Sequence, residues 1–522
     1  MVRRGYSVLL VCILLIGAVG AARAQVDPEM QTIELTLDQC LRAALDNNLS
    51  LVSARKDPAV SEQNVVAEDA AYDYGTFAEV DHSELQQELS NLFSLNSRTS
   101  DSLSIGYDKS LRFGGNYTIS LDMSNSDASG PLVTTPSSYD AQLAMSLNLP
   151  MLRGFGKQFQ TLNLELARGN LEISREQLRG TAEGTMKSVE DAYWDLVAAR
   201  EALRIAELSR QRAKDLLDLN RKKVEVGTLA PIEITQAEAG VASEEEGVIV
   251  ARTTLINAED ELRRLMAVEE SSPLWEMRLV PTTDPVSEEV TVDLADSLET
   301  ALAERPELNQ AHRTVRNRLL SERVARNGKM PGLDLVAQVR PSGNNFETII
   351  GVGPDMIPGT PDDTSTTFTS GQIGTALSEV PDFVNYDWSL GLRFSYTIGN
   401  RAAKANYAIA TINREQAEVN LADQEQSIRV DVRRAVREVR SGIQRVEAAR
   451  ANQRLQQEKL DAERKKFDNG MSTSFEVLTF QNDLADAELA TVRAMLDYNK
   501  ALSGLELAKG TLLAARGLSI AN

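Results

Sequence analysis

The residues best suited to chemistry are two glutamates at matching positions of an internal duplication. Glu233 and Glu476 each lie six residues after a glycine, Gly227 or Gly470, at the turn between two predicted helices. A carboxylate in the first turn of a helix interacts favourably with the helix dipole, which is the simplest role for both side chains.

Catalysis and cofactor binding find little support elsewhere in the chain. The two histidines, His82 and His312, have neither metal-binding spacing nor a nucleophile motif around them. Removal of an export signal would leave Cys40 as the only cysteine, which excludes an internal disulfide and a cysteine metal site. We therefore expect no enzyme, no cofactor and no metal site, and we interpret Cys40 as a buried small hydrophobic residue.

The two glutamates belong to a repeat of about 243 residues that predicts long paired helices. The segment that begins at Val189 returns at Val432 without a gap, and both copies carry apolar residues with the heptad spacing of helices that pack side by side. Each copy continues past its glycine into a second heptad-patterned helix. Each unit is therefore predicted to be an antiparallel helical hairpin, and the first long helix, at about 157–226, would span roughly 105 Å.

Strand patterns lie between the helical segments. Polar and apolar residues alternate in 116–123 and 142–149 of the first half, and in 333–340 and 388–398 of the second. These patterns predict one β-hairpin in each half and hence four strands per chain. A further alternating segment, 102–107, has no predicted partner.

The N-terminus and the charge bear on location. Residues 1–24 resemble a secretory signal peptide, with two arginines, an apolar stretch and a cleavage site between Ala24 and Gln25. The formal charge of −21, or −24 after cleavage, makes nucleic acid an unsuitable partner. No later apolar run is long enough for a membrane-spanning helix, so a mature chain that crosses a membrane would have to do so as a barrel.

The sequence divides into two repeats. We expect a signal peptide at 1–24, a first repeat at 25–268, a linker at 269–290, a second repeat at 291–516 and a tail at 517–522. The first repeat would hold a β-hairpin at about 77–149 and a helical hairpin at 157–268. The second would hold a β-hairpin at about 333–398, with an exposed loop at 341–387, and a helical hairpin at 402–515.

Several short motifs occur along the chain: LPMLRGFG at 149–156, DAYWDLVAAR at 191–200, VGT at 226–228 and RPEL at 305–308. In their order and spacing, and over nearly all of the mature chain, they resemble the TolC family of outer-membrane efflux channels. The first would be the corner where a strand meets a helix, with Pro150, Gly154 and Gly156, and Gly399 would end the second corner. That second corner lacks the proline, and the second tip has Asn469-Gly470-Met471 in place of Val226-Gly227-Thr228.

The resemblance implies a mainly α-helical protein with a β-barrel portion. Three copies would each give four strands to one twelve-stranded barrel in the outer-membrane lipid, and their duplicated helical hairpins would form a periplasmic tube. Such channels are the passive exit ducts of tripartite efflux pumps or type I secretion systems. The implied partners are a periplasmic adaptor (membrane fusion) protein and an inner-membrane transporter of the RND, ABC or MFS type.

The resemblance also assigns candidate site residues. Glu476 would belong to a ring of carboxylates at the gated periplasmic entrance, with Thr479 at the next acidic position of the family and Glu233 as the counterpart in the first tip. Helix capping is an equally good account of Glu476. The surface that an adaptor grips would be formed by the two tips, Val226, Gly227 and Thr228 with Asn469, Gly470 and Met471.

Two alternatives remain at this stage. A periplasmic coiled-coil scaffold without a conduit would explain the heptads but not the paired strand patterns. In the loop at 341–387, the segments 353–355 and 361–363 could offer carboxylate ligands to calcium, although a solvated acidic loop is the simpler interpretation.

Overall fold

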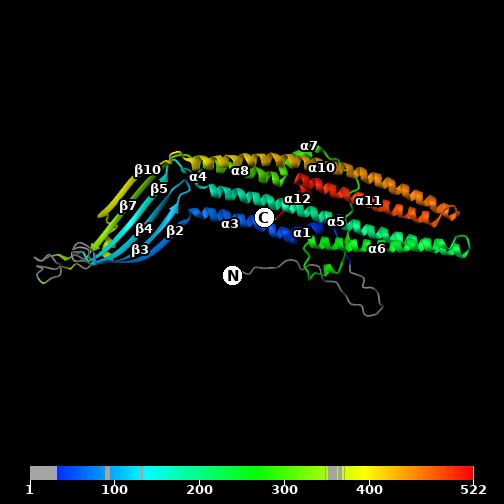
Figure 1. Ribbon diagram of the computed structural model, residues 1–522, viewed down its shortest axis with the longest axis horizontal. Coiled ribbons are helices and arrows are strands. Elements are labelled where there is room, and N and C mark those ends of the chain that lie inside the picture. Colours follow the sequence, from blue (N-terminus) through cyan, green and yellow to red (C-terminus); the bar gives the residue numbers. More distant parts are fainter. Residues whose placement is uncertain are drawn as a thin grey trace.

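The computed structural model describes residues 32–88, 95–129, 133, 135–346, 349–350, 361, 367–368 and 371–520. The predicted signal peptide and its cleavage site, Ala24 and Gln25, lie outside these ranges, and so do most of the acidic segments at 353–355 and 361–363. The molecule is elongated, with helices along most of its length and a sheet at one end (Figure 1).

Four long helices make up the body. They are α5 (Leu162–Glu225), α6 (Ile232–Leu265), α10 (Arg401–Asp468) and α11 (Ser474–Lys509). At 1.5 Å per residue, α5 and α10 are each roughly 100 Å long. The helices α5 and α6 form one antiparallel hairpin, α10 and α11 form the other, and α11 also packs along α5 (Figure 1).

The heptad pattern corresponds to the buried faces of these helices. Val189, Leu196 and Leu203 of α5 are buried, and so are their counterparts Val432, Val439 and Val446 of α10. Gly442 of α10 allows close approach of its hairpin partner α11, because a β-carbon at this position would lie only 3.1 Å from the Tyr498 ring. The predicted combination of long duplicated helices with a sheet is confirmed.

Shorter elements surround the long helices. The helices are α1 (Leu37–Asn47), α2 (Leu49–Ala54), α3 (Lys56–Asp69), α4 (Lys157–Gln160), α7 (Leu294–Glu304), α8 (Pro306–Asn327), α9 (Ile373–Glu379) and α12 (Leu512–Ala515), with 3₁₀ turns at Ala70–Tyr72 and Pro273–Trp275. The parallel strands β1 (Thr32–Leu35) and β6 (Arg278–Pro281) pair beside the middle of α5. Two buried tyrosines anchor the adjacent segment 282–290: the Tyr193 hydroxyl accepts from the Thr283 amide at 2.9 Å, and the Tyr498 hydroxyl accepts from the Val290 amide at 3.0 Å.

The sheet corrects the predicted strand count. Within the described residues it has six strands in the order β10-β7-β5-β4-β3-β2, not four, with every neighbouring pair antiparallel. The strands are β2 (Tyr74–Gln86), β3 (Ser97–Ser110), β4 (Asn116–Ser129), β5 (Ser137–Pro150), β7 (Gly332–Phe346) and β10 (Asn385–Ser395). The first half thus supplies two hairpins. The segment 102–107, which had no predicted partner, lies in β3. Its partner β2 was not predicted, because charged residues interrupt the apolar alternation of β2.

The register places apolar side chains on one face of all six of these strands. Leu121 pairs with Leu143, Met145 with Val339 and Ala337 with Leu390, and the neighbouring strands extend the same face through Ile105 and Ala78. The opposite face carries short polar side chains, among them Ser104, Ser120, Asp122, Ser146 and Gln338. Because side chains alternate along a strand, this register separates an apolar surface from a polar one.

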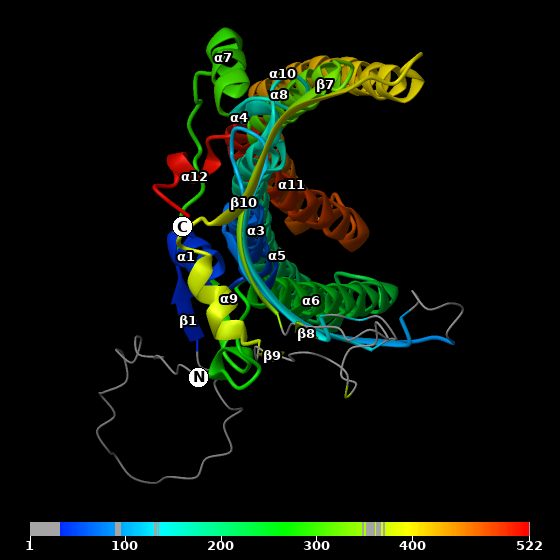
Figure 2. The same ribbon diagram turned by 90° about the vertical axis from the view of Figure 1, so that its left-hand side faces the viewer.

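Viewed along its long axis, the molecule is curved. The sheet and the long helices bend toward the same side, and α9 lies against the outer, convex side of the sheet (Figure 2). Ala376 and Val380 of this segment are buried against Ala141 on the apolar face. The apolar face is therefore the convex one, and the polar face lines the concave side.

The predicted exposed loop at 341–387 is also corrected. The strand β7 continues into this segment and ends at Phe346, and α9 packs on the sheet. The short strands β8 (Ile349–Ile350) and β9 (Thr367–Phe368) pair with each other. A β-carbon on Gly343 would come within 2.0 Å of the Ala376 carbonyl oxygen, so only glycine allows this approach. Composition alone indicated a loop because glycine and proline are frequent there.

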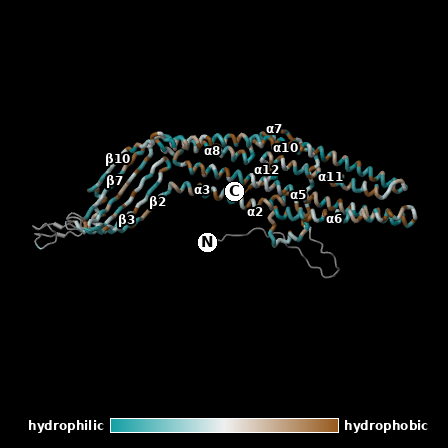
Figure 3. The backbone as a smooth tube through the Cα atoms, viewed as in Figure 1, coloured by the Kyte–Doolittle hydropathy of each residue, from teal (hydrophilic) through white to brown (hydrophobic). Residues whose placement is uncertain are grey.

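Hydropathy varies over short intervals along the chain. In Figure 3, polar and apolar residues alternate along both strands and helices. None of the helices in the described ranges combines the length and the apolar character needed to span a membrane.

Candidate functional site at the helical tips

The first tip is the turn between α5 and α6. The helix α5 has Lys222 and Lys223 in its last turn, where positive side chains interact favourably with the negative end of the helix dipole. Gly227 follows at φ +76°, and the Thr228 amide bonds the Lys223 carbonyl at 2.9 Å. This is the left-handed closure that glycine provides at a helix end, and it leaves the preceding Val226 side chain 72% exposed.

The second tip repeats this geometry and adds a capping box. Gly470 has φ +72°, and the Met471 amide bonds the Lys466 carbonyl at 2.9 Å. The Thr473 hydroxyl accepts from the Glu476 amide at 3.3 Å, and the Glu476 carboxylate accepts from the Thr473 amide at 3.4 Å and from the Ser472 hydroxyl at 2.8 Å. Glu476 therefore caps α11, while its side chain stays exposed.

Glu233 plays a different part from its counterpart Glu476. Its carboxylate accepts from the Ser474 amide at 3.3 Å, so the first tip caps the first helix turn of the second. The Asn220 amide donates to the Ser474 hydroxyl at 2.7 Å and to the Glu233 carbonyl at 3.2 Å. The two tips are therefore bonded to each other within one chain.

A buried acid and two lysines complete the network. The Glu463 carboxylate accepts from the Ser472 hydroxyl at 2.6 Å and from Lys466 at 2.9 Å, and these hydrogen bonds lower the pKa of Glu463. The Lys223 ammonium lies 3.9 Å from the centre of the Phe467 ring and donates to the Phe467 carbonyl at 3.2 Å.

Asn220 and Glu463 were not among the predicted site residues, although the sequence carries a signal for both. They occupy the same position of the two repeats, where the heptad pattern requires an apolar residue. A polar residue in an apolar seam indicates a specific partner, and here the partners are the serines of the second tip.

The tips also present exposed apolar side chains. Met471 is 71% exposed and Phe475 is 66% exposed, and Ile232 and Val226 of the first tip are exposed as well. Asn469 caps its own helix through the Lys465 carbonyl at 2.7 Å, and the Thr479 hydroxyl bonds the Phe475 carbonyl at 2.8 Å. Thr479 and Glu476 are exposed one helix turn apart, so a ligand or partner can reach both.

The corners between sheet and helices form a separate cluster. Pro150 ends β5, and Gly154 and Gly156 follow with φ +81° and +107°. The Gly154 amide donates to the Asn327 side chain at 2.7 Å, which ties this corner to the end of α8. Gly399, with φ +85°, turns the chain between β10 and α10. These residues direct the strands away from the helical body.

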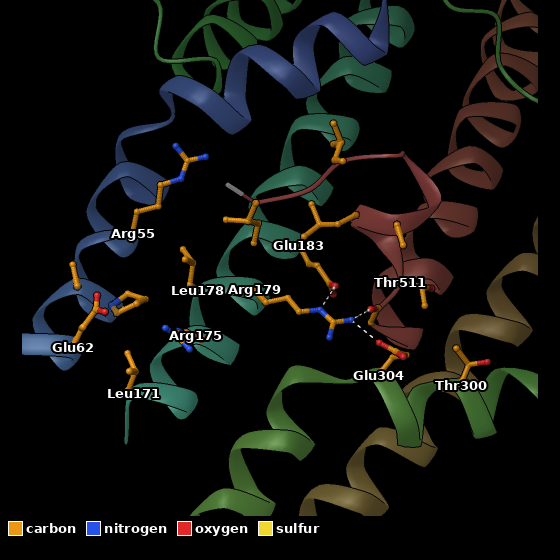
Figure 4. A pocket seen from close by; sticks show the side chains of 17 residues that line it. Arg55, Glu62, Leu171, Arg175, Leu178, Arg179, Glu183, Thr300, Glu304 and Thr511 are labelled. Atoms are coloured by element: carbon orange, nitrogen blue, oxygen red, sulfur yellow. Dashed lines mark hydrogen bonds and ion pairs between the residues drawn. The ribbon is translucent and has the colours of Figure 1, made fainter. Parts of the chain in front are cut away.

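A cavity of about 950 Å³ lies midway along the body, between α3, α5 and the C-terminal segment (Figure 4). Arg179 points across it to Glu304 at 3.0 Å and to the Gly510 carbonyl at 2.8 Å, and its Nε lies 3.5 Å from Glu183. Burial raises the pKa of Glu183 to about 7, although Arg179 partly counteracts this shift. In the described part of the chain, no three His, Cys, Asp or Glu side chains are grouped so as to hold a metal ion.

Two helices of roughly 100 Å, each paired with a shorter antiparallel helix in a duplicated hairpin, carry a sheet with one apolar face. A family model described as outer membrane efflux protein matches residues 116–268 and 297–511. The chain belongs to this family. The protein is therefore an efflux channel of the outer membrane, with its long helices on the periplasmic side.

Solved structures share the fold of this chain. The CmeC outer membrane channel of Campylobacter jejuni is 14% identical, with a TM-score of 0.65 over 93% of this chain and 87% of that one. The open state of the MtrE outer membrane channel of Neisseria gonorrhoeae is 17% identical, with a TM-score of 0.61 over 91% and 89%. The outer membrane protein VceC of Vibrio cholerae is 13% identical, with a TM-score of 0.61 over 93% and 97%. No curated protein sequence gives a significant match.

Proposed function

We propose that the protein is a homotrimeric exit duct of a tripartite efflux pump or a type I secretion system. It would conduct cargo passively from a periplasmic entrance at the helical tips to the outer membrane. The observation that carries this proposal is the curved sheet, with an apolar band on its convex face, at the end of helices roughly 100 Å long. A coiled-coil scaffold without a conduit would account for the helices but not for this sheet.

The open curvature of one chain supports the trimer. The curved sheet of a single chain does not close around a lumen, so its concave polar face would lie open to solvent. Closed rotational symmetry lets copies of one chain complete a tube, and a cyclic trimer is the arrangement that the family resemblance implies. The apolar face of the sheet would then meet lipid all round, while the polar face would line the conduit.

The tips are the proposed docking surface for a periplasmic adaptor, which would connect the duct to an inner-membrane transporter. Val226, Met471 and Phe475 expose apolar area at the far end from the sheet, and the last turns of α5 and α10 beside them each carry two lysines. Exposed apolar side chains with a polar rim are typical of protein interaction sites.

The entrance ring is part of the same proposal. Three copies of Glu476 around the symmetry axis would attract cations. Capping does not exclude this role, because the carboxylate is exposed while it accepts its hydrogen bonds. Thr479 would form a neutral level next to this ring, and Glu233 would hold the second tip in position.

The experiment that tests the function combines assembly with export. The gene would be deleted in its native host, and efflux of a dye panel and secretion of polypeptides would be compared with those of a complemented strain. Purified protein would be weighed in detergent by native mass spectrometry. We expect three chains per particle and loss of export in the deletion strain. A monomer, or unchanged export of every cargo, would contradict the proposal.

A further inference from the structure

The sheet ends in two strands whose outer edges have no partner among the described residues. The strands β2 and β10 are the two edge strands of the sheet, and every residue in both is exposed. They have 13 and 11 residues, so each offers a long row of unpaired backbone groups. Figure 1 shows them on opposite sides of the sheet.

The directions of the two edge strands suit pairing between copies of this chain. The strand β2 leaves the helical body, because it follows α3, and β10 returns to it, because it precedes α10. If β10 of one copy lies beside β2 of the next, the two strands are antiparallel, as are the neighbouring pairs within this sheet. An even number of strands per chain allows this alternation to continue around a closed barrel.

The faces of the edge strands also agree. Leu390 and Leu392 of β10 belong to the apolar face of the sheet, and so do Ala78 and Val80 of β2. On the polar face, β10 carries Arg393 and β2 carries acidic Glu79 and Asp81. Pairing between copies would therefore continue the apolar surface. On the polar side, Asp387 of β10 is already bonded to Arg340 at 2.8 Å, which leaves Arg393 on the same face as the acidic residues of β2.

We propose that β2 of one protomer pairs with β10 of the next, so that the trimer closes an eighteen-stranded barrel from the six described strands of each chain. This inference rests on the proposed trimeric channel, and it replaces the twelve strands that the family resemblance implies. The strands β2 and β3 are the added hairpin. They continue the register of β4 without interruption, so the hairpin belongs to the barrel wall.

The added strands would widen the conduit. With a strand spacing of about 4.8 Å and a tilt of about 40°, twelve strands give a backbone diameter of roughly 24 Å and eighteen give roughly 36 Å. The polar face of β3 and β4 carries serines at 102, 104, 120 and 124, which project little into the lumen. The membrane end of this duct would therefore admit cargo too wide for a twelve-stranded barrel.

Cysteine crosslinking tests the pairing. In a Cys40→Ala background, one cysteine would replace Glu79 or Asp81 on β2 and a second would replace Ser389, Gly391 or Arg393 on β10. Paired strands bring α-carbons to about 5.5 Å, within disulfide range. We expect at least one combination to give a covalent three-chain band on non-reducing gels. Ala78→Cys with Arg393→Cys is the matched control, because these side chains lie on opposite faces and should not crosslink.

The outcomes separate this inference from the proposed function. A second series would combine the β10 cysteines with Ser120→Cys or Asp122→Cys on β4. Trimers in which β10 crosslinks to β4, or in which no β2 position crosslinks to β10, would overturn the eighteen-stranded barrel and leave the channel function intact. Protein that is monomeric in detergent and in native membranes would instead contradict the trimeric channel itself.

Discussion

The Asn220 amide donates a 2.7 Å hydrogen bond to the Ser474 hydroxyl and so joins the two halves of the duplication, 254 residues apart in the chain. The Glu233 carboxylate supports the same serine through its backbone amide. The two helical hairpins thus end in one bonded unit. A change in one tip is therefore expected to affect the other.

Asn220→Ala tests this coupling. The substitution leaves the buried Ser474 hydroxyl without its donor, which should cost about 1–3 kcal/mol locally. We expect faster hydrogen exchange of backbone amides in both tips and unchanged exchange in the sheet. Gln211→Ala is the control, since that exposed side chain bonds only its own helix neighbour Asp215. Faster exchange confined to the first tip would show that the tips are not coupled.

Gly227→Asp and Gly470→Asp test adaptor docking. Both glycines have positive φ, so a β-carbon should cost about 1 kcal/mol, but each faces open space and the fold should tolerate the change. We expect trimers of normal mass, reduced export and weaker co-purification of the adaptor. Gly247→Asp, on an exposed stretch of α6 away from the tips, should have little effect. Normal export by both tip variants would rule out the docking assignment.

Glu476→Gln separates the charge of the proposed ring from helix capping. Glutamine keeps an acceptor for Ser472 and Thr473, so the capping box and the trimer should persist. We expect cation selectivity in planar bilayers to fall and block by divalent cations from the periplasmic side to weaken. Asp38→Asn on α1, an exposed acid far from the tips, is the control. If block and selectivity do not change, Glu476 serves only as a cap.

Glu183→Gln should change the pH dependence of stability. Burial raises the pKa of Glu183 from 4.5 to about 7, so the folded protein binds the proton more tightly than the unfolded chain. Stability should fall as pH rises from about 4.5 to about 7, by on the order of 2 kcal/mol from this group. The glutamine variant should lack this loss and unfold at higher temperature than wild type above pH 7.

Thermal unfolding of the purified protein at several pH values measures this difference. Glu62→Gln is the control, because Glu62 lines the same cavity but is exposed. Parallel profiles for wild type and Glu183→Gln would show that Glu183 titrates in the folded protein as it does in the unfolded chain.

The sequence by itself determined the duplicated helical hairpins and the glycine turns. Heptad spacing predicts which faces are buried whatever the partner, as Val189 and Val432 show. Glycine after a helix end predicts positive φ from backbone sterics alone, as at Gly227 and Gly470. The alternation in β4 and β5 was equally clear, because their apolar faces are uninterrupted.

Only the tertiary structure decided the six-stranded sheet and the tip network. The alternation in β2 is weak, and its pairing depends on β3, which brings Val80 opposite Leu103. Glu233 and Glu476 are equivalent in sequence, yet one caps a helix of the other repeat and the other caps its own. Each hairpin has different neighbours, and long-range packing selects among hydrogen bonds that local sequence allows equally.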